Sequence, residues 1–227
     1  MKIYISPSDQ TENPYAWGNT NEGTQCHRIA KALEEAFLRV GGCEVKRNDI
    51  YSISRGISES NAWGADYHIC IHTNAFNGSV MGTRMFYGQA GSNGQKACDA
   101  VLKALAPITP GTSDNSRSYP ELNEVRLVSG QTVYCEVGFH DTVQEAKWIV
   151  EHTADIAEAI CKGMCEHLGI KYFEKNASPA PASAESPSTN TLYRVQVGAF
   201  SIKANAEYLK SKLKAAGYDA FIVEVPK

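Results

Sequence analysis

Two apolar runs in this chain end at residues that can bind a metal ion or move a proton. The first is IHTNA, which contains His72, and the second is VYCEVGFHD, which contains Glu136 and His140. Imidazole and carboxylate groups are zinc ligands, and a carboxylate beside a metal-activated water can serve as a general base. With the carboxylate of Glu22, these runs outline a mononuclear zinc hydrolase.

His72 is the better ligand candidate of the two histidines on its strand. Side chains of a strand alternate, so His68, Cys70 and His72 share one face. Four residues of extended chain separate the two imidazoles by about 13 Å, so we do not expect them to bind the same ion. His72 lies at the end of the strand, where a site can form, and His68 is interpreted as a structural histidine.

Glu22 lies at the start of the first helix that the sequence predicts. The Asn-Thr-Asn segment before it can cap that helix. Cys26, Ile29 and Leu33 follow at helical spacing and place Glu22 in line with the buried stripe. Two interpretations stay open: Glu22 is a zinc ligand, or it is a first-turn carboxylate that complements the helix dipole.

Glu136 follows a buried apolar run, where a carboxylate is unfavourable unless it has a partner or a function. Burial raises the pKa of such a carboxylate toward the range of a general base. The alternative is a structural ion pair with a basic residue such as Arg126. His140, four residues further on, is a candidate zinc ligand, a candidate oxyanion stabiliser or a surface loop residue. The other histidines are assigned to solvent or structural roles: His27, His152 and His167.

Length and composition indicate a globular protein. The chain has 227 residues, 43% apolar and 21% charged, which suits one domain of ordinary size plus an appendage. The net charge of -3 argues against nucleic-acid binding, and no apolar run approaches the roughly 18 residues of a membrane span. The N-terminus begins a strand at once, so we expect synthesis in the cytoplasm without a signal peptide. The seven cysteines are scattered and are expected to be reduced core thiols.

Strands and helices alternate along most of the chain. This alternation predicts an α/β fold with a mostly parallel sheet covered by helices on both faces. Sites in such folds form at the carboxyl ends of strands, where both apolar runs place their polar residues. The predicted strands are residues 2–6, 44–47, 67–72, 83–87 and 133–137. The predicted helices are residues 22–40, 55–64, 95–105 and 143–168, the last as one helix or two in series.

A change in composition marks a domain boundary. Residues 1–175 form the first predicted domain, and residues 176–190, rich in Pro, Ala and Ser, predict a flexible linker. Residues 191–227 predict a βαβ unit, with strands at 192–200 and 220–223 on either side of a helix. A unit of this size cannot bury a full core alone, so it needs a second copy, a partner chain or a continuation.

Several short motifs follow one another in a distinctive order over roughly residues 1–170. They are Ser6-Pro7, Glu22 ahead of RIAKAL, then IHTNA, GTRMFY, LNEVR and CEVGF. In this order they resemble the zinc N-acetylmuramoyl-L-alanine amidases of the amidase_3 type. The resemblance implies a peptidoglycan hydrolase that cuts the amide between the lactyl group of N-acetylmuramic acid and L-alanine, with Zn2+ as cofactor. It carries zinc ligation over to Glu22 and His72, and the catalytic carboxylate over to Glu136.

One ligand of that family has no histidine counterpart in this chain. The family has a histidine after the first strand in an Asp-Pro-Gly-His pattern, and this chain has SPSD there, so Asp9 takes the place of the histidine. Three possibilities stay open: Asp9 is the third ligand, His140 replaces the lost imidazole, or the site is weakened or metal-free. Zinc accepts carboxylate ligands, so Glu22, His72, Asp9 and a water would still make four.

The C-terminal unit carries a second resemblance. The segments YRVQVGAF, ANA and LKAAGY are similar to the sporulation-related repeat (SPOR), a module associated with binding peptidoglycan glycan strands. Only the first half of the usual two-unit domain is present. Either this half-repeat pairs with a second copy in a dimer, or the domain is cut short; a generic βαβ oligomerisation unit is the alternative.

Together these inferences predict a cell-wall amidase with a linked wall-targeting unit, acting on the wall after release from the cytoplasm. Two settings fit: a phage endolysin released through a holin, which is preferred, and a mother-cell lysin of a spore former. Two rival functions stay open. One is a catalytically inactive peptidoglycan-binding protein, against which an intact Glu136 argues, and the other is a zinc peptidase acting within the stem peptide.

Overall fold

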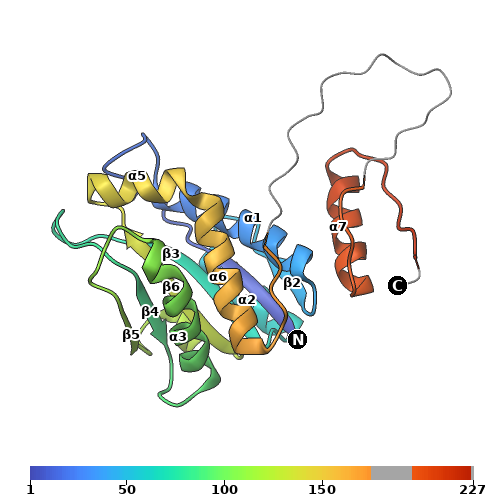
Figure 1. Ribbon diagram of the computed structural model, residues 1–227, viewed down its shortest axis with the longest axis horizontal. Coiled ribbons are helices and arrows are strands. Elements are labelled where there is room, and N and C mark those ends of the chain that lie inside the picture. Colours follow the sequence, from blue (N-terminus) through green and yellow to red (C-terminus); the bar gives the residue numbers. More distant parts are fainter. Residues whose placement is uncertain (175–195, 226–227) are drawn as a thin grey trace.

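The computed structural model describes residues 1–174 and 196–225. In these residues six strands form one sheet in the order β2-β1-β3-β6-β4-β5 (Figure 1). Neighbouring strands are parallel except β4 and β6, which are antiparallel. The mostly parallel α/β sheet that the sequence predicts is therefore confirmed. The strands are β1 (Lys2–Pro7), β2 (Glu44–Arg47), β3 (Tyr67–Asn74), β4 (Arg84–Tyr87), β5 (Asn115–Ser118) and β6 (Gln131–Phe139).

Helices connect the strands and cover the sheet. The segment predicted as one helix or two in series forms two helices, which meet at His152. Three short elements were not predicted, because β5, α4 and the 3-10 helix η1 have no sustained apolar period. The helices are α1 (Glu22–Val40), α2 (Ile53–Trp63), α3 (Asn93–Leu105), η1 (Ala106–Ile108), α4 (Asn123–Arg126), α5 (Val143–Glu151), α6 (Thr153–Leu168) and α7 (Lys203–Ala215).

The main hydrophobic core lies between one face of the sheet and helices α1, α3 and α6. Leu33 and Phe37 of α1 are fully buried in it, together with Ile69 of β3, Val133 of β6 and Ile160 of α6. These are the apolar positions that recur at helical spacing or alternate along strands in the sequence. This large core anchors the strands whose carboxyl ends carry the polar residues.

A smaller cluster covers the opposite face of the sheet. It consists of Cys70, Phe86, Val125 and Tyr134, next to the short helix α4. Because side chains alternate along β3, His72 points to this face together with Cys70. Because few apolar side chains pack on this face, polar side chains can lie at the carboxyl ends of its strands.

Two further features concern the chain's cysteines and its helices. All seven cysteines are buried free thiols, the state that the composition predicts. Within residues 1–174 and 196–225, no helix combines the length and the apolar character needed to cross a membrane.

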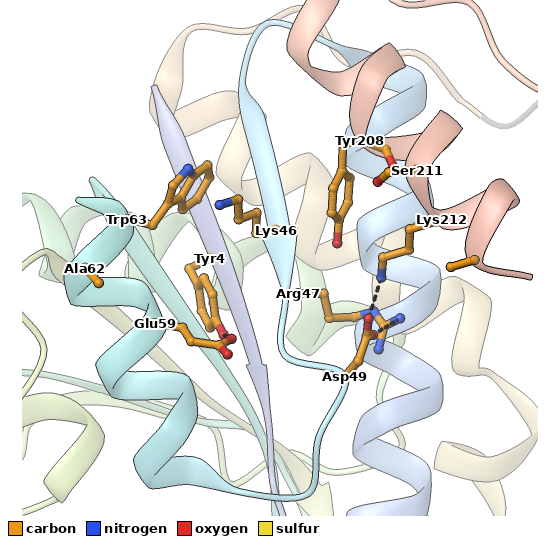
Figure 2. A pocket seen from close by; sticks show the side chains of 11 residues that line it. Tyr4, Lys46, Arg47, Asp49, Glu59, Ala62, Trp63, Tyr208, Ser211 and Lys212 are labelled. Atoms are coloured by element: carbon orange, nitrogen blue, oxygen red, sulfur yellow. Dashed lines mark hydrogen bonds and ion pairs between the residues drawn. The ribbon is translucent and has the colours of Figure 1, made fainter. Parts of the chain in front are cut away.

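The helix predicted in the C-terminal unit is present as α7 (Figure 1). It contacts the edge strand β2. The Tyr208 hydroxyl donates a hydrogen bond to Glu34 Oε1 at 2.8 Å. Lys212 Nζ lies 2.7 Å from Asp49 Oδ2, as Figure 2 shows. These contacts join α7 to the first domain.

The two strands predicted beside this helix are not formed in the described residues. Residues 196–202 and 216–225 belong to no strand. A strand needs a neighbour that shares its backbone hydrogen bonds, and the described part of the unit supplies none. The predicted linker, residues 176–190, and the beginning of the first predicted strand lie outside the described residues.

Candidate functional site

His72 is the centre of the polar cluster at the carboxyl edge of the sheet. Its Nδ1 lies 3.0 Å from Oε1 of Glu22, and its Nε2 lies 2.9 Å from Oε2 of Glu124. The imidazole stacks on the ring of Tyr134 with centroids 4.6 Å apart. Glu136 of β6 is the register partner of His72 on the neighbouring strand, so their side chains share a face. The structure thus brings together His72, Glu22 and Glu136, which the sequence singles out separately.

Glu22 reaches this edge because α1 begins there. The Asn21 side chain caps α1 by accepting a hydrogen bond from the Thr24 N–H, which fixes the first turn of the helix. Asn13 Nδ2 donates to Glu22 Oε2 at 2.9 Å, and only 1% of Glu22 is exposed. Burial alone would raise the pKa of Glu22, but its hydrogen bonds, chiefly to His72, lower it below its ordinary value. Glu22 is therefore held as an anion facing the imidazole.

Glu124 is a site residue that sequence reasoning missed. It accepts a hydrogen bond from Ser6 Oγ at 2.6 Å and lies 3.3 Å from Nε2 of His68. Burial opposes its ionisation, but hydrogen bonds to His68 and His72 lower the pKa of Glu124 to about 2. Its helix α4 is four residues long, so no periodic pattern pointed to a buried carboxylate there.

His68 has the structural place that the sequence predicts for it. Its ring is fully buried and stacks on Tyr4, with centroids 5.5 Å apart. Its Nε2 meets Glu124 rather than a position shared with His72, and its Nδ1 has no hydrogen-bond partner among the described residues. His68 thus supports Glu124 from behind the site.

Glu136 is partly accessible to solvent, whereas its Oε2 is shielded and has no hydrogen-bond partner in the described part of the chain. The alternative partner Arg126 instead donates to Asn123 Oδ1 at 2.8 Å. Burial of the carboxylate raises the pKa of Glu136 to about 7, and the charges of Glu22 and Glu124 act in the same direction against that of His72. A carboxylate with this pKa can accept and release a proton near neutrality.

The two candidates for a third ligand make their hydrogen bonds to groups outside the Glu22–His72 pair. Asp9 Oδ2 accepts a hydrogen bond from the backbone N–H of Ile53, the first residue of α2, at 2.9 Å. His140 is 4% exposed, and its Nδ1 lies 2.9 Å from Thr73 Oγ1. Neither side chain has a hydrogen bond to Glu22 or His72 within residues 1–174 and 196–225. Burial lowers the pKa of His140, which keeps its imidazole neutral and able to act as a ligand.

The charge balance of the cluster fits a divalent cation. Three carboxylates, Glu22, Glu124 and Glu136, surround the single imidazole of His72, and Glu22, Glu124 and His72 are each at most 3% exposed. Even a protonated His72 leaves an excess of negative charge when all three are ionised. The unpartnered Oε2 of Glu136 is further evidence that the described side chains do not complete this site alone. A cation held by Nδ1 of His72 and a Glu22 oxygen would offset this charge.

A second group of donors lies deeper in the same face. The donor atoms of His68, Cys70 and Glu124 lie within 4.8 Å of one another, and all three side chains are buried. Burial raises the pKa of the Cys70 thiol well above its ordinary value, which disfavours the thiolate that zinc binds. These three residues are nevertheless a second place where the described side chains could hold a metal ion.

Two hollows were found on the described surface. The larger, about 780 Å³, lies between α7, α2 and the first two strands, with Trp63, Tyr208 and Lys46 on its wall (Figure 2). It is remote from His72. The smaller, about 340 Å³, opens at the carboxyl edge of β3 and β6, where Asn74 and Phe139 line it. Its position beside the polar cluster makes it the hollow relevant to the site.

Family models match nearly the whole described chain. A model described as N-acetylmuramoyl-L-alanine amidase matches residues 3–166. A model described as SPOR domain matches residues 168–224, so this match begins ahead of the predicted linker. Both resemblances seen in the sequence are confirmed.

Curated relatives and solved structures agree with these matches. The sporulation-specific N-acetylmuramoyl-L-alanine amidase of Bacillus subtilis (strain 168) is 26% identical over 232 residues, which cover 98% of this chain and 84% of that protein. N-acetylmuramoyl-L-alanine amidase CwlM of Bacillus licheniformis is 25% identical over 230 residues, with 98% and 85% covered. The catalytic domain of CwlV from Bacillus (Paenibacillus) polymyxa var. colistinus shares the fold, with a TM-score of 0.66 at 20% identity over 75% of this chain and 100% of that one. An amidase structure from Clostridium difficile 630 gives a TM-score of 0.64 at 20% identity over 74% of this chain and 96% of that one.

Proposed function

Because the chain belongs to the N-acetylmuramoyl-L-alanine amidase family, we propose that it cuts the lactyl–L-alanine amide of peptidoglycan with a zinc ion held by Glu22 and His72. The observation that carries this proposal is the placement of Glu136. Its carboxylate is the register partner of His72, and burial raises its pKa to about 7. A base of this strength directly beside a metal position is what amide hydrolysis requires.

The metal ion and Glu136 have different roles in the proposed reaction. When bound, zinc would supply a Lewis acid that polarises the scissile carbonyl and lowers the pKa of water. Glu136 takes the proton of the attacking water and later delivers it to the departing nitrogen of L-alanine. Its raised pKa suits both transfers, because the group changes protonation state near neutral pH.

Glu124 acts as a positioning residue for His72. Burial opposes protonation of His72, but hydrogen bonds to Glu124 and Glu22 raise its pKa to about 10, so Nδ1–H donates to Glu22 and Nε2–H donates to Glu124. The Nδ1 proton would give way to a metal ion, with Nε2–H still donating to Glu124. A carboxylate on the second nitrogen of a metal-binding histidine fixes both the tautomer and the ring direction. Ser6 Oγ and His68 in turn hold Glu124 in place.

Asp9 and His140 are the two candidates for the third zinc ligand, and a weakened or metal-free site is the remaining possibility. The role of His140 depends on which atom of its hydrogen bond to Thr73 carries the proton. If Nδ1–H donates to Thr73, Nε2 has a free lone pair and can bind the metal. If Thr73 donates to Nδ1, Nε2–H can instead stabilise the oxyanion of the tetrahedral intermediate. The Tyr15 hydroxyl already donates to Thr73 Oγ1 at 3.1 Å, so both arrangements satisfy Thr73.

The C-terminal match supports binding to peptidoglycan, because the SPOR model covers residues 168–224. The description of the Bacillus subtilis relative as sporulation-specific favours a sporulation lysin over the phage endolysin that we preferred from the sequence. Pairing of the C-terminal unit with a second copy stays a prediction.

Product analysis tests the proposed activity. Zinc-loaded protein is incubated with purified peptidoglycan, and new amino groups and reducing ends are identified. We expect N-terminal alanine on released peptides, glycan strands left intact, and no release by Glu136→Gln. New amino groups inside the stem peptide would show a peptidase instead, and no release with retained wall binding would show an inactive scaffold.

A further inference from the structure

Three polar side chains form a row across the carboxyl edge of the sheet. His72 on β3 is the register partner of Glu136 on β6, and Glu136 is the register partner of Arg84 on β4. Register partners in a sheet place their side chains on the same face, and neighbouring strands lie about 4.8 Å apart. Arg84 therefore starts one strand beyond Glu136, about 10 Å from His72 along the row.

Arg84 is a cation held beside the catalytic edge by neutral groups. Its guanidinium donates to Ser113 Oγ at 2.9 Å and to the carbonyl of Thr83 at 3.5 Å. Its Cζ lies 5.3 Å from the centroid of the Phe139 ring. Within residues 1–174 and 196–225, no ion pair with a carboxylate was found for it. Its register partner Glu136 is acted on by the charges of His72, Glu22 and Glu124 rather than by that of Arg84.

The guanidinium faces a hollow of about 340 Å³ that is suited to a peptide. Arg84, Ser113 and Asn74 supply its polar groups, while Phe76, Val80 and Phe139 supply apolar surface. Phe76 is 75% exposed, which is costly for a large apolar side chain unless something packs on it. The hollow thus offers one cationic end and an apolar wall.

Resting on the amidase function proposed above, we propose that Arg84 binds a free carboxylate of the stem peptide one residue beyond the scissile amide. The reacting amide must lie beside the Glu22–His72 pair and within reach of Glu136. The distance of about 10 Å along the row corresponds to about three extended residues of about 3.3 Å each, and the long Arg84 side chain itself spans part of it, so a carboxylate on the residue after the scissile L-alanine amide is within its reach. The planar guanidinium fork matches a carboxylate, and Lys does not reproduce this geometry.

The negative charge of the neighbouring carboxylates also favours a cation at the position of Arg84. A substrate carboxylate near this edge approaches the carboxylates of Glu136 and Glu22, which repel it. Arg84 offsets that repulsion on the side away from His72. The inferred substrate class is therefore stem peptides whose second residue has a free α-carboxylate rather than an amide.

The test compares two soluble disaccharide-tripeptides that differ only in this group, with D-glutamate or D-isoglutamine as the second residue. We expect the wild type to have a kcat/KM about tenfold to a hundredfold higher for the glutamate form, mainly through KM. Arg84→Met should remove this preference by lowering kcat/KM on the glutamate form to the level of the isoglutamine form. Arg84→Lys should restore part of the preference, and Arg55→Met, which changes an exposed arginine of α2, should leave it intact.

The outcomes separate this inference from the proposed function. Equal rates of the wild type on both substrates, or cleavage of intact walls but of neither substrate, would overturn the role of Arg84. A loss of activity on both substrates in Arg84→Met would also overturn it, because that pattern shows a structural role. If the wild type releases no N-terminal alanine even from intact walls, the amidase function itself fails.

Discussion

The carboxylate of Glu22 lies 3.0 Å from Nδ1 of His72, although 50 residues separate them in the chain. The contact exists because the first turn of helix α1 and the last residues of strand β3 meet at one edge of the sheet. Both side chains are buried, so neither is satisfied by solvent. This pair is the half of the proposed metal site for which the structure gives direct geometry.

Replacing His72 should remove the metal. His72→Ala takes away the imidazole between Glu22 and Glu124 and leaves two buried anions facing a cavity, so we expect loss of the single bound zinc measured by elemental analysis. His152→Ala is the matched control, since the His152 ring stacks on Trp148 and its Nδ1 lies 2.9 Å from the Trp148 carbonyl oxygen. Full zinc content in His72→Ala would exclude it as a ligand.

Replacing Glu124 should weaken zinc binding without displacing a ligand. Glu124→Leu removes the acceptor for Nε2 of His72, and we expect zinc affinity to fall by about tenfold to a hundredfold in chelator competition. Glu124→Gln keeps an acceptor oxygen and should lose less. Glu34→Gln serves as the control, because Glu34 pairs with Arg47 outside the site. Equal zinc affinity of Glu124→Leu and wild type would disprove the positioning role.

Glu136 should make the stability of the metal-free protein depend on pH. The pKa of Glu136 is raised from 4.5 to about 7 in the folded state, so folding favours its protonated form. Protonated Glu136 contributes up to about 3 kcal/mol to the free energy of unfolding. This contribution is fully present below pH 4.5 and is lost as the pH rises through about 7. Glu136→Gln lacks the carboxylate and should therefore gain stability relative to wild type above neutral pH.

Urea unfolding in the presence of a chelator, at about pH 5 and about pH 8.5, measures this difference. Glu12→Gln, which changes an exposed glutamate, should show no such trend. A pH-independent difference between Glu136→Gln and wild type would mean that Glu136 has an ordinary pKa. With zinc restored, the same variant should keep its metal and fold but lose turnover.

Metal content of two further variants should identify the third ligand. If Asp9 binds zinc, Asp9→Ala lowers zinc affinity and His140→Ala does not; if His140 binds it, the order reverses. If His140→Ala keeps zinc but loses activity, His140 stabilises the oxyanion. Unchanged zinc and unchanged activity in both variants would exclude both residues.

Removing residues 176–227 should leave the first domain folded. The buried residues of the main core all precede residue 176, and the C-terminal unit adds few contacts to them: Phe200 packs against that core, the buried Asn205 donates to the Cys43 carbonyl, and Tyr208 donates to Glu34. We expect Tm to fall by no more than about 4 °C, with sedimentation onto walls greatly weakened. Tyr208→Phe, which removes one docking hydrogen bond, should keep wall binding. Unfolding of the truncated protein would show that the domain boundary is misplaced.

Part of this fold and site could be predicted from the sequence, because the signals are local. Helical spacing from Cys26 to Phe37 and alternation along β3 give element type, and each ionisable residue at a strand end stands out against its apolar run. Glu22, His72 and Glu136 were found in this way. Glu124 was not, because a four-residue helix has no period to read and its partners Ser6 and His68 are distant in sequence.

The sequence by itself determined the α/β class, the order of the motifs and the residues able to do acid–base or metal chemistry. Only the tertiary structure decided which of them meet. Strand order and register place Arg84 beside Glu136, which is itself the register partner of His72, while the hydrogen bonds of Asp9 and His140 go to Ile53 and Thr73. The physical reason is that hydrophobic patterning fixes which faces are buried, whereas long-range packing fixes distances between side chains and, through burial and neighbouring charge, their pKa values.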